Sequence, residues 1–96
     1  MVKITLGLQI LPYVEEERLY EVIDAVISYI ASSGVKYEVC AMETVMEGDI
    51  DRLLDIVKKA QEICIEQGAT RVISGIKIDY KKMGVTIDEK VGKYRR

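Results

Sequence analysis

Apolar and polar positions alternate along the first stretch of the chain. Over residues 2–11 the even positions are apolar, and the odd positions are mostly polar or glycine. A period of two is typical of a strand with one buried face. Pro12 is expected to end this strand, because proline has no backbone N–H to donate to a ladder.

The spacing of apolar residues then changes to the i, i+3, i+4, i+7 pattern of a helix with one buried side. The first predicted helix carries Leu19, Val22, Ile23, Val26, Ile27 and Ile30, and Gly34 suits its C-terminal turn. A second helix carries Leu53, Leu54, Val57, Ala60 and Cys64. Asp49 is its expected N-cap and Gly68 its expected end.

Three further elements complete the prediction. Residues 35–47 are strand-like but long, and a turn at Ala41 and Met42 would divide them into a hairpin. Residues 70–80 return to alternation, which predicts a fourth strand. A short final helix is expected over residues 87–94, with Thr86 or Asp88 as its cap.

The predicted order is β-α-β-β-α-β, which is the order of a ferredoxin-like α+β sandwich. Its antiparallel sheet would carry two helices on one face, in a single domain covering residues 1–96. The second face would present Thr5, Gly7, Gln9, Ile73, Gly75, Lys77 and Asp79. Two glycines in this mixed set allow another backbone to approach closely, so we expect this face to meet another subunit.

Composition narrows the classes of partner. Fourteen basic and sixteen acidic residues give a net charge of -2, which lacks the electrostatic footprint of a nucleic-acid-binding or membrane-binding protein. No apolar run approaches the length of a membrane span. Only Cys40 and Cys64 are present, without any histidine, so the sequence predicts no metal site. Two reduced thiols fit a cytoplasmic protein.

Catalytic chemistry finds little support in the residue types. A chain without histidine lacks the usual base for an activated serine or cysteine nucleophile. The seven glycines are scattered, so no phosphate-binding loop is visible. We therefore expect a protein that is not an enzyme.

The stretch YEVCAMETVMEG, residues 37–48, places three carboxylates and a hydroxyl among core-like residues. In a regular strand, Thr44 and Glu47 would face opposite sides. A strand ending before Glu47 could bring them into one pocket. The alternative is that Glu47 only takes part in a helix entry, that Thr44 is an ordinary strand residue, and that Glu38 and Glu43 are surface charges.

Three more residues are candidates for binding, each with a structural alternative. Tyr37 could form a pocket wall, or belong to the core or an interface. Asp79 lies at a strand end beside Tyr80 and Lys81, where charges usually face solvent. Gln9 offers both a donor and an acceptor on the second sheet face.

Several segments together resemble a known family. ILP at the first strand end, KYEV followed by METVMEG, RVISGIKIDYKK and TIDEKVGKY are similar to the small thiamine-binding family related to YkoF. The resemblance covers nearly the whole chain. It implies ferredoxin-like subunits that dimerise through their sheets, commonly into a homotetramer (a dimer of dimers), with a ligand pocket near subunit contacts and no catalytic centre.

The resemblance also implies the ligand, which is thiamine or its hydroxymethylpyrimidine part, with no cofactor required. It makes Thr44 and Glu47 candidates for the polar edge of the ligand and Tyr37 a candidate wall, with Gln9 and Asp79 as further polar contacts. One departure is that better-known members resemble SLYPLG at the end of the first strand, where this chain has the bulkier LQILPYV.

The leading hypothesis is a non-catalytic, homo-oligomeric protein that binds thiamine or a related pyrimidine. One alternative is an oligomeric interaction or structural protein with another ligand or none. The other is a small enzyme acting on a thiamine precursor.

Overall fold

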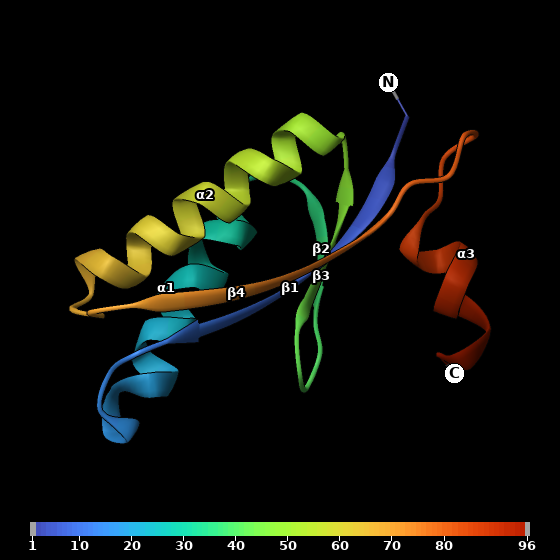
Figure 1. The fold of residues 1–96 in the computed structure, drawn as a ribbon. Coiled ribbons are helices and arrows are strands. Elements are labelled where there is room, and N and C mark those ends of the chain that lie inside the picture. Colours follow the sequence, from blue (N-terminus) through green and yellow to red (C-terminus); the bar gives the residue numbers. More distant parts are fainter. Residues whose placement is uncertain (1, 96) are drawn as a thin grey trace.

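The fold is a four-stranded antiparallel sheet with two long helices on one face (Figure 1). The computed structural model describes residues 2–95. Its elements are β1 (Ile4–Pro12), the 3₁₀ helix η1 (Glu16–Arg18), α1 (Leu19–Ser32), β2 (Lys36–Val39), β3 (Thr44–Gly48), α2 (Ile50–Glu66), β4 (Val72–Asp79), α3 (Ile87–Val91) and the 3₁₀ helix η2 (Gly92–Tyr94). The predicted ferredoxin-like order is confirmed.

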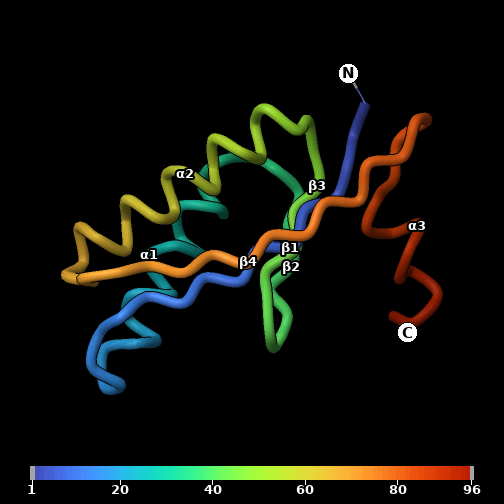
Figure 2. Tube along the Cα trace, in the orientation of Figure 1, coloured from blue at the N-terminus to red at the C-terminus, as the bar shows by residue number. Residues whose placement is uncertain are grey.

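The strand order is β2-β3-β1-β4, so β1 lies inside the sheet. Residues 4–8 of β1 pair with β3, and residues 5–12 pair with β4. From residue 9 onward β1 therefore has a strand partner on one side only. Figure 2 shows this end of β1 running beside β4 beyond the β2–β3 hairpin. This difference in strand length positions the candidate site.

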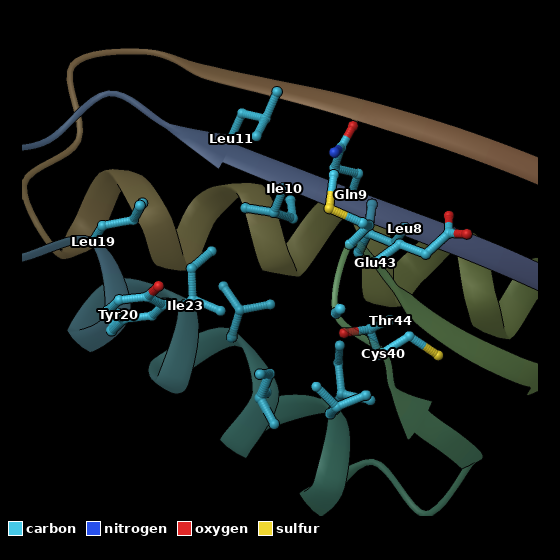
Figure 3. Close-up of a pocket in the computed structure, with 16 residues that line it drawn as sticks. Leu8, Gln9, Ile10, Leu11, Leu19, Tyr20, Ile23, Cys40, Glu43 and Thr44 are labelled. Atoms are coloured by element: carbon cyan, nitrogen blue, oxygen red, sulfur yellow. The ribbon is translucent and has the colours of Figure 1, made fainter. Parts of the chain in front are cut away.

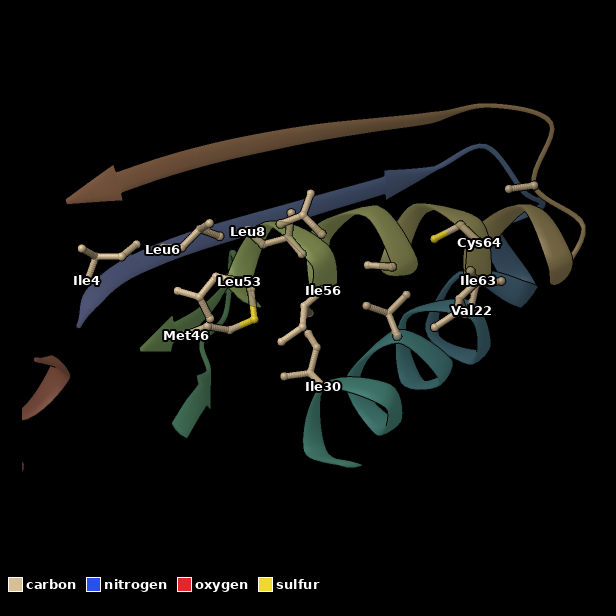
Figure 4. Packing of buried hydrophobic residues seen from close by; sticks show 14 residues of the cluster. Ile4, Leu6, Leu8, Val22, Ile30, Met46, Leu53, Ile56, Ile63 and Cys64 are labelled. Atoms are coloured by element: carbon tan, nitrogen blue, oxygen red, sulfur yellow. The ribbon is translucent and has the colours of Figure 1, made fainter. Parts of the chain in front are cut away.

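The core lies between the sheet and the two long helices (Figure 4). The even residues of β1 face it, as the alternation predicts, because their side chains point to the α1 and α2 side. The largest side chains with no exposed surface come from the sheet and from both helices: Ile4, Leu6, Val22, Ile30, Met46, Leu53, Ile56 and Cys64.

The predicted hairpin is confirmed, with residues 40–43 as its loop. The Cys40 N–H donates to the Glu43 carbonyl over 2.9 Å, which closes the loop. β3 does not end before Glu47, because Glu47 pairs regularly with Thr5 on one side and Lys36 on the other. The irregularity that would have brought Thr44 and Glu47 together is therefore absent from this strand.

The short helix α3 covers part of the second sheet face (Figure 1). Of the two predicted caps, Thr86 fills the role: its Oγ1 accepts from the Glu89 N–H over 3.1 Å. Lys36 binds Asp88 of α3 over 2.7 Å, and this hydrogen bond raises the pKa of Lys36 above its ordinary value. The sequence predicted a helix here but not where it packs, because its few apolar residues do not indicate which face of the protein it contacts.

Candidate functional site

A cleft of about 260 Å³ opens between α1, the end of β1 and the β2–β3 hairpin. Its walls are mostly aliphatic (Figure 3). The lining residues are Leu8, Gln9, Ile10, Leu11, Leu19, Tyr20, Ile23, Val26, Ile27, Ile30, Val39, Cys40, Ala41, Met42, Glu43 and Thr44. Since pockets for drug-sized ligands measure roughly 300–1,000 Å³, this cleft suits a ligand about the size of one or two small rings.

The cleft exists because β3 stops while β1 continues. Thr44 of β3 pairs with Leu8, and the chain then turns into the hairpin loop. The Tyr13 N–H donates to the Arg71 carbonyl over 2.8 Å, so odd residues of β1 direct their backbone groups toward the β4 side. The backbone N–H and C=O of Ile10 consequently point to the other side, where β3 has ended. This places a backbone donor and acceptor at the cleft.

Thr44 supplies a hydroxyl to the same space. It faces the α1 side of the sheet, in register with Leu8, and Figure 3 shows its oxygen between the hairpin and α1. Tyr20, in the first turn of α1, lies at the mouth of the cleft and is largely exposed. The arrangement is an apolar slot with a few polar groups along one wall, which is typical of a site for a flat, partly polar ligand.

Gln9 also lines the cleft, but its side chain points away from α1 (Figure 3). A Cβ atom built on Gly75 would lie 3.5 Å from Gln9 Oε1, which places the amide on the second sheet face. Gln9 therefore contributes backbone to the cleft. Its donor and acceptor side-chain groups are on the far side of the sheet.

The three carboxylates of residues 37–48 all lie on the second face of the sheet. Glu38 pairs with Arg95, and Glu43 pairs with Lys77 over 3.1 Å. Glu47 is only 7% exposed, and its Oε1 accepts from the Ile87 N–H over 2.8 Å. Thr44 and Glu47 thus lie on opposite faces of the sheet. Glu47 does take part in a helix entry, but the helix is α3.

The other two predicted residues lie outside the cleft. Tyr37 is on the edge strand β2, opposite Met46. Two residues further along β2, Val39 lies opposite Thr44, and this pair borders the cleft. Asp79 ends β4 and forms an ion pair with Lys90 over 2.5 Å. Of the five predicted residues, the structure brings Thr44 and Gln9 together at the cleft and separates Tyr37, Glu47 and Asp79 from it.

Sequence reasoning missed most of the cleft wall. Leu19, Ile23 and Ile27 follow the helical pattern of core residues, and nothing in that pattern tells a cleft wall from a packed core. Ile10 was missed for a different reason, since its contribution is a backbone edge that only the pairing register reveals.

The two thiols have different environments, which gives a simple test of the structure. Cys40 is exposed on the hairpin loop, whereas Cys64 is buried and its burial raises the pKa of its thiol. We expect an aromatic disulfide reagent to modify one thiol per native chain and two after unfolding in urea. Cys40→Ser should remove the native reaction. Rapid modification of two thiols in the native protein would contradict this packing.

Two other features are absent from residues 2–95. No group of three or more carboxylate or thiol side chains is arranged to hold a metal ion in that range. Within the same range, none of the helices has both the length and the apolar character needed to cross a bilayer.

Comparisons with known proteins give consistent results. The sequence profile of the family described as thiamine-binding protein matches residues 6–95. A UPF0045 protein of Clostridium perfringens is 74% identical over 89 residues, which cover 93% of this chain and 94% of the relative.

Two solved structures share the fold at high sequence identity. A domain of unknown function, DUF77, from Bacillus cereus has a TM-score of 0.92 and 48% identity, covering 98% of this chain and 91% of the other. A Thermotoga maritima protein, assigned provisionally to thiamine biosynthesis or salvage, has a TM-score of 0.89 and 45% identity over 97% of this chain and 99% of the other. The chain belongs to the thiamine-binding protein family.

Proposed function

We propose that this protein binds thiamine, or its hydroxymethylpyrimidine part, in the cleft between α1 and the hairpin, without catalysing a reaction. The observation that carries the proposal is an aliphatic slot with the Thr44 hydroxyl at one wall, in a chain of the thiamine-binding family. Membership of the family suggests a small-molecule ligand. The chemistry of the slot is the reason for choosing this site.

An aminopyrimidine fits these walls in a defined way. Its faces are apolar enough to lie between the aliphatic side chains of α1 and the hairpin loop. Its edge carries ring nitrogens and an amino group, which need donors and acceptors. The Thr44 hydroxyl can both donate and accept, and the Ile10 backbone offers one donor and one acceptor. The thiazolium cation of thiamine would extend to the mouth, where the Tyr20 ring can stabilise positive charge.

The remaining predicted residues have indirect roles in this proposal. Glu47 holds α3 through the Ile87 N–H, and Asp79 binds Lys90 just beyond α3's first turn. Both would influence the second face of the sheet and not the ligand. Tyr37 would affect the hairpin from the edge of the sheet.

The proposal includes a homo-oligomer in the cytoplasm. The part of the second face that α3 leaves uncovered exposes Leu11 and Ile73, which lie opposite each other next to Gly75. An apolar patch beside a glycine suits the face of another copy. The exposed free thiol of Cys40 is compatible with a reducing compartment.

The test is isothermal titration calorimetry of the ligand-free full chain with thiamine and with hydroxymethylpyrimidine. Thr44→Val, which keeps the shape and removes the hydroxyl, is expected to weaken binding by about tenfold, because one hydrogen bond is lost. Ile23→Trp should abolish binding by filling the slot. Thr70→Val is the matched control, since Thr70 is exposed and does not line the cleft.

The outcomes separate the alternatives. Saturable binding that Thr44→Val weakens and Thr70→Val leaves unchanged would support the site. Flat titrations by a folded, correctly assembled protein would reject the ligand and favour an interaction or structural role. Conversion of either compound during incubation, followed by chromatography, would instead indicate an enzyme.

A further inference from the structure

One acidic residue of α1, Asp24, stands at the rim of the cleft. Residues three or four positions apart are neighbours on the same side of a helix. Asp24 comes four residues after Tyr20 and three before Ile27, and both of these residues line the cleft. Figure 3 shows the Tyr20 ring on the α1 side of the slot. Asp24 therefore lies one helical turn beyond Tyr20 along the same rim.

The charge of Asp24 is not neutralised within the chain. The residue is exposed, and no ion pair or hydrogen bond reaches its carboxylate from the part of the chain that the structure describes. The sequence of α1, LYEVIDAVISYIAS, contains neither lysine nor arginine, so no nearby turn of the helix supplies a partner. The carboxylate is therefore available to a cationic group at the mouth of the cleft.

Further negative charge lies at the same end of α1. The preceding 3₁₀ helix η1 carries Glu16 and Glu17, which are both exposed. The cation of this segment, Arg18, is used elsewhere: its guanidinium donates to the Gln67 carbonyl over 2.6 Å and pairs with Glu21 over 3.2 Å. Gln67 follows α2 and is not a cleft residue. Arg18 thus ties α1 to the end of α2 and is not directed at the ligand space.

The lining of the cleft contains no cation. None of its sixteen residues is a lysine or an arginine, and the charged residue among them, Glu43, pairs with Lys77 over 3.1 Å. Proteins hold phosphate groups with arginine, lysine or several converging backbone N–H groups. The cleft has no such side chain, and the free β1 edge offers it the single N–H of Ile10. A phosphate group at this mouth would meet carboxylates and no counter-charge.

We propose that Asp24 is a specificity-determining residue, which favours the cationic, unphosphorylated form of the ligand and disfavours its phosphate esters. The inference rests on the function proposed above and adds a selectivity to it. The thiazolium ring of thiamine carries the positive charge and also bears the hydroxyethyl group to which a phosphate is esterified. Both groups would therefore lie at the mouth. There the Tyr20 face and the Asp24 carboxylate attract the ring, and the same carboxylate repels a phosphate.

The test is isothermal titration calorimetry of the full chain with thiamine, thiamine monophosphate and hydroxymethylpyrimidine. The wild-type protein should bind thiamine at least about tenfold more tightly than the monophosphate, because the phosphate adds negative charge beside a carboxylate. Asp24→Asn keeps the shape and removes the charge. It should weaken thiamine binding by about three- to fivefold, and leave the binding of hydroxymethylpyrimidine, which lacks the thiazolium, unchanged.

Asp55→Asn is the matched control. Asp55 is an exposed aspartate in the middle of α2 and does not line the cleft, so its replacement makes the same change in net charge away from the site. It should leave the affinities for all three compounds unchanged. Raising the salt concentration should narrow the wild-type preference for thiamine, since dissolved ions screen exposed charges.

Charge reversal gives the strongest contrast. Asp24→Lys should raise the affinity for thiamine monophosphate relative to thiamine by about tenfold or more, because the rim then attracts the phosphate and repels the thiazolium. Two results would overturn the proposal and leave the proposed function standing: equal wild-type affinities for thiamine and its monophosphate, or a thiamine affinity that Asp24→Asn does not alter. Flat titrations with both thiamine and hydroxymethylpyrimidine would reject the proposed function, and this selectivity with it.

Discussion

Truncation of Ile56 to alanine is expected to lower the free energy of unfolding by about 2–5 kcal/mol. Ile56 has no exposed surface and lies in the middle of α2, within the cluster between the helices and the sheet. The variant loses buried methyl and methylene groups and leaves a cavity that the surrounding helices and strands only partly fill. Since domains of this size are stable by roughly 5–15 kcal/mol, the loss is a large fraction of the total.

Ile65→Ala on the same helix separates packing from helix propensity. Both substitutions replace isoleucine by alanine in α2, so the propensity change is shared, but Ile65 is more than half exposed. Ile65→Ala should change the free energy of unfolding by no more than about 0.5 kcal/mol. Urea unfolding followed by circular dichroism measures both. Equal losses in the two variants would mean that the core does not lie where the structure places it.

Glu47→Ala is expected to lower the free energy of unfolding by about 1.5–3 kcal/mol, because it removes a buried hydrogen bond to a charged group. The Glu47 carboxylate is buried beneath α3 and accepts the Ile87 N–H, a donor at the start of that helix. The alanine variant leaves this donor without its acceptor. Glu47→Gln keeps an oxygen in place and should lose less than half as much.

Glu43→Ala is the control for Glu47, because it removes a carboxylate at the opposite end of β3, and the partner of Glu43, Lys77, is exposed. Exposed ion pairs contribute about 0–1 kcal/mol, so its effect should be small. Hydrogen exchange gives a second readout. Backbone amides of residues 85–91 should exchange faster in Glu47→Ala, and unchanged exchange there would show that Glu47 does not hold α3.

The hydrophobic pattern was sufficient to predict the sheet, the two long helices and the hairpin. The apolar residues of β1 recur at every second position, which only a strand places on one face. The stripe in α2 that contains Val57, Ala60 and Cys64 has the spacing that only a helix places on one side. Burial of one face then fixes which residues enter the core. The short α3 was predicted from its residue types and two candidate caps, Thr86 and Asp88, of which the structure selects Thr86.

The candidate site was only partly predictable, because its lining depends both on the face to which each strand residue points and on where each strand ends. Thr44 was predicted as a site residue and does line the cleft. Glu47, three residues later in the same strand, was grouped with it, although a regular pleat directs the two side chains to opposite faces. Gln9 was correctly expected on the second face by its side chain, and its backbone reaches the cleft as well.

The sequence by itself determined the order of elements and the buried side of each. The spacing of apolar residues can be read within each segment, and burial of those residues fixes which side of the element faces the core. Only the tertiary structure decided where β3 stops beside β1, which opens the cleft and directs the Ile10 backbone into it. Only it placed α3 over Glu47 and β4 at the edge of the sheet. These features depend on which segments lie side by side, and contacts between residues far apart in the chain have no local pattern that records them.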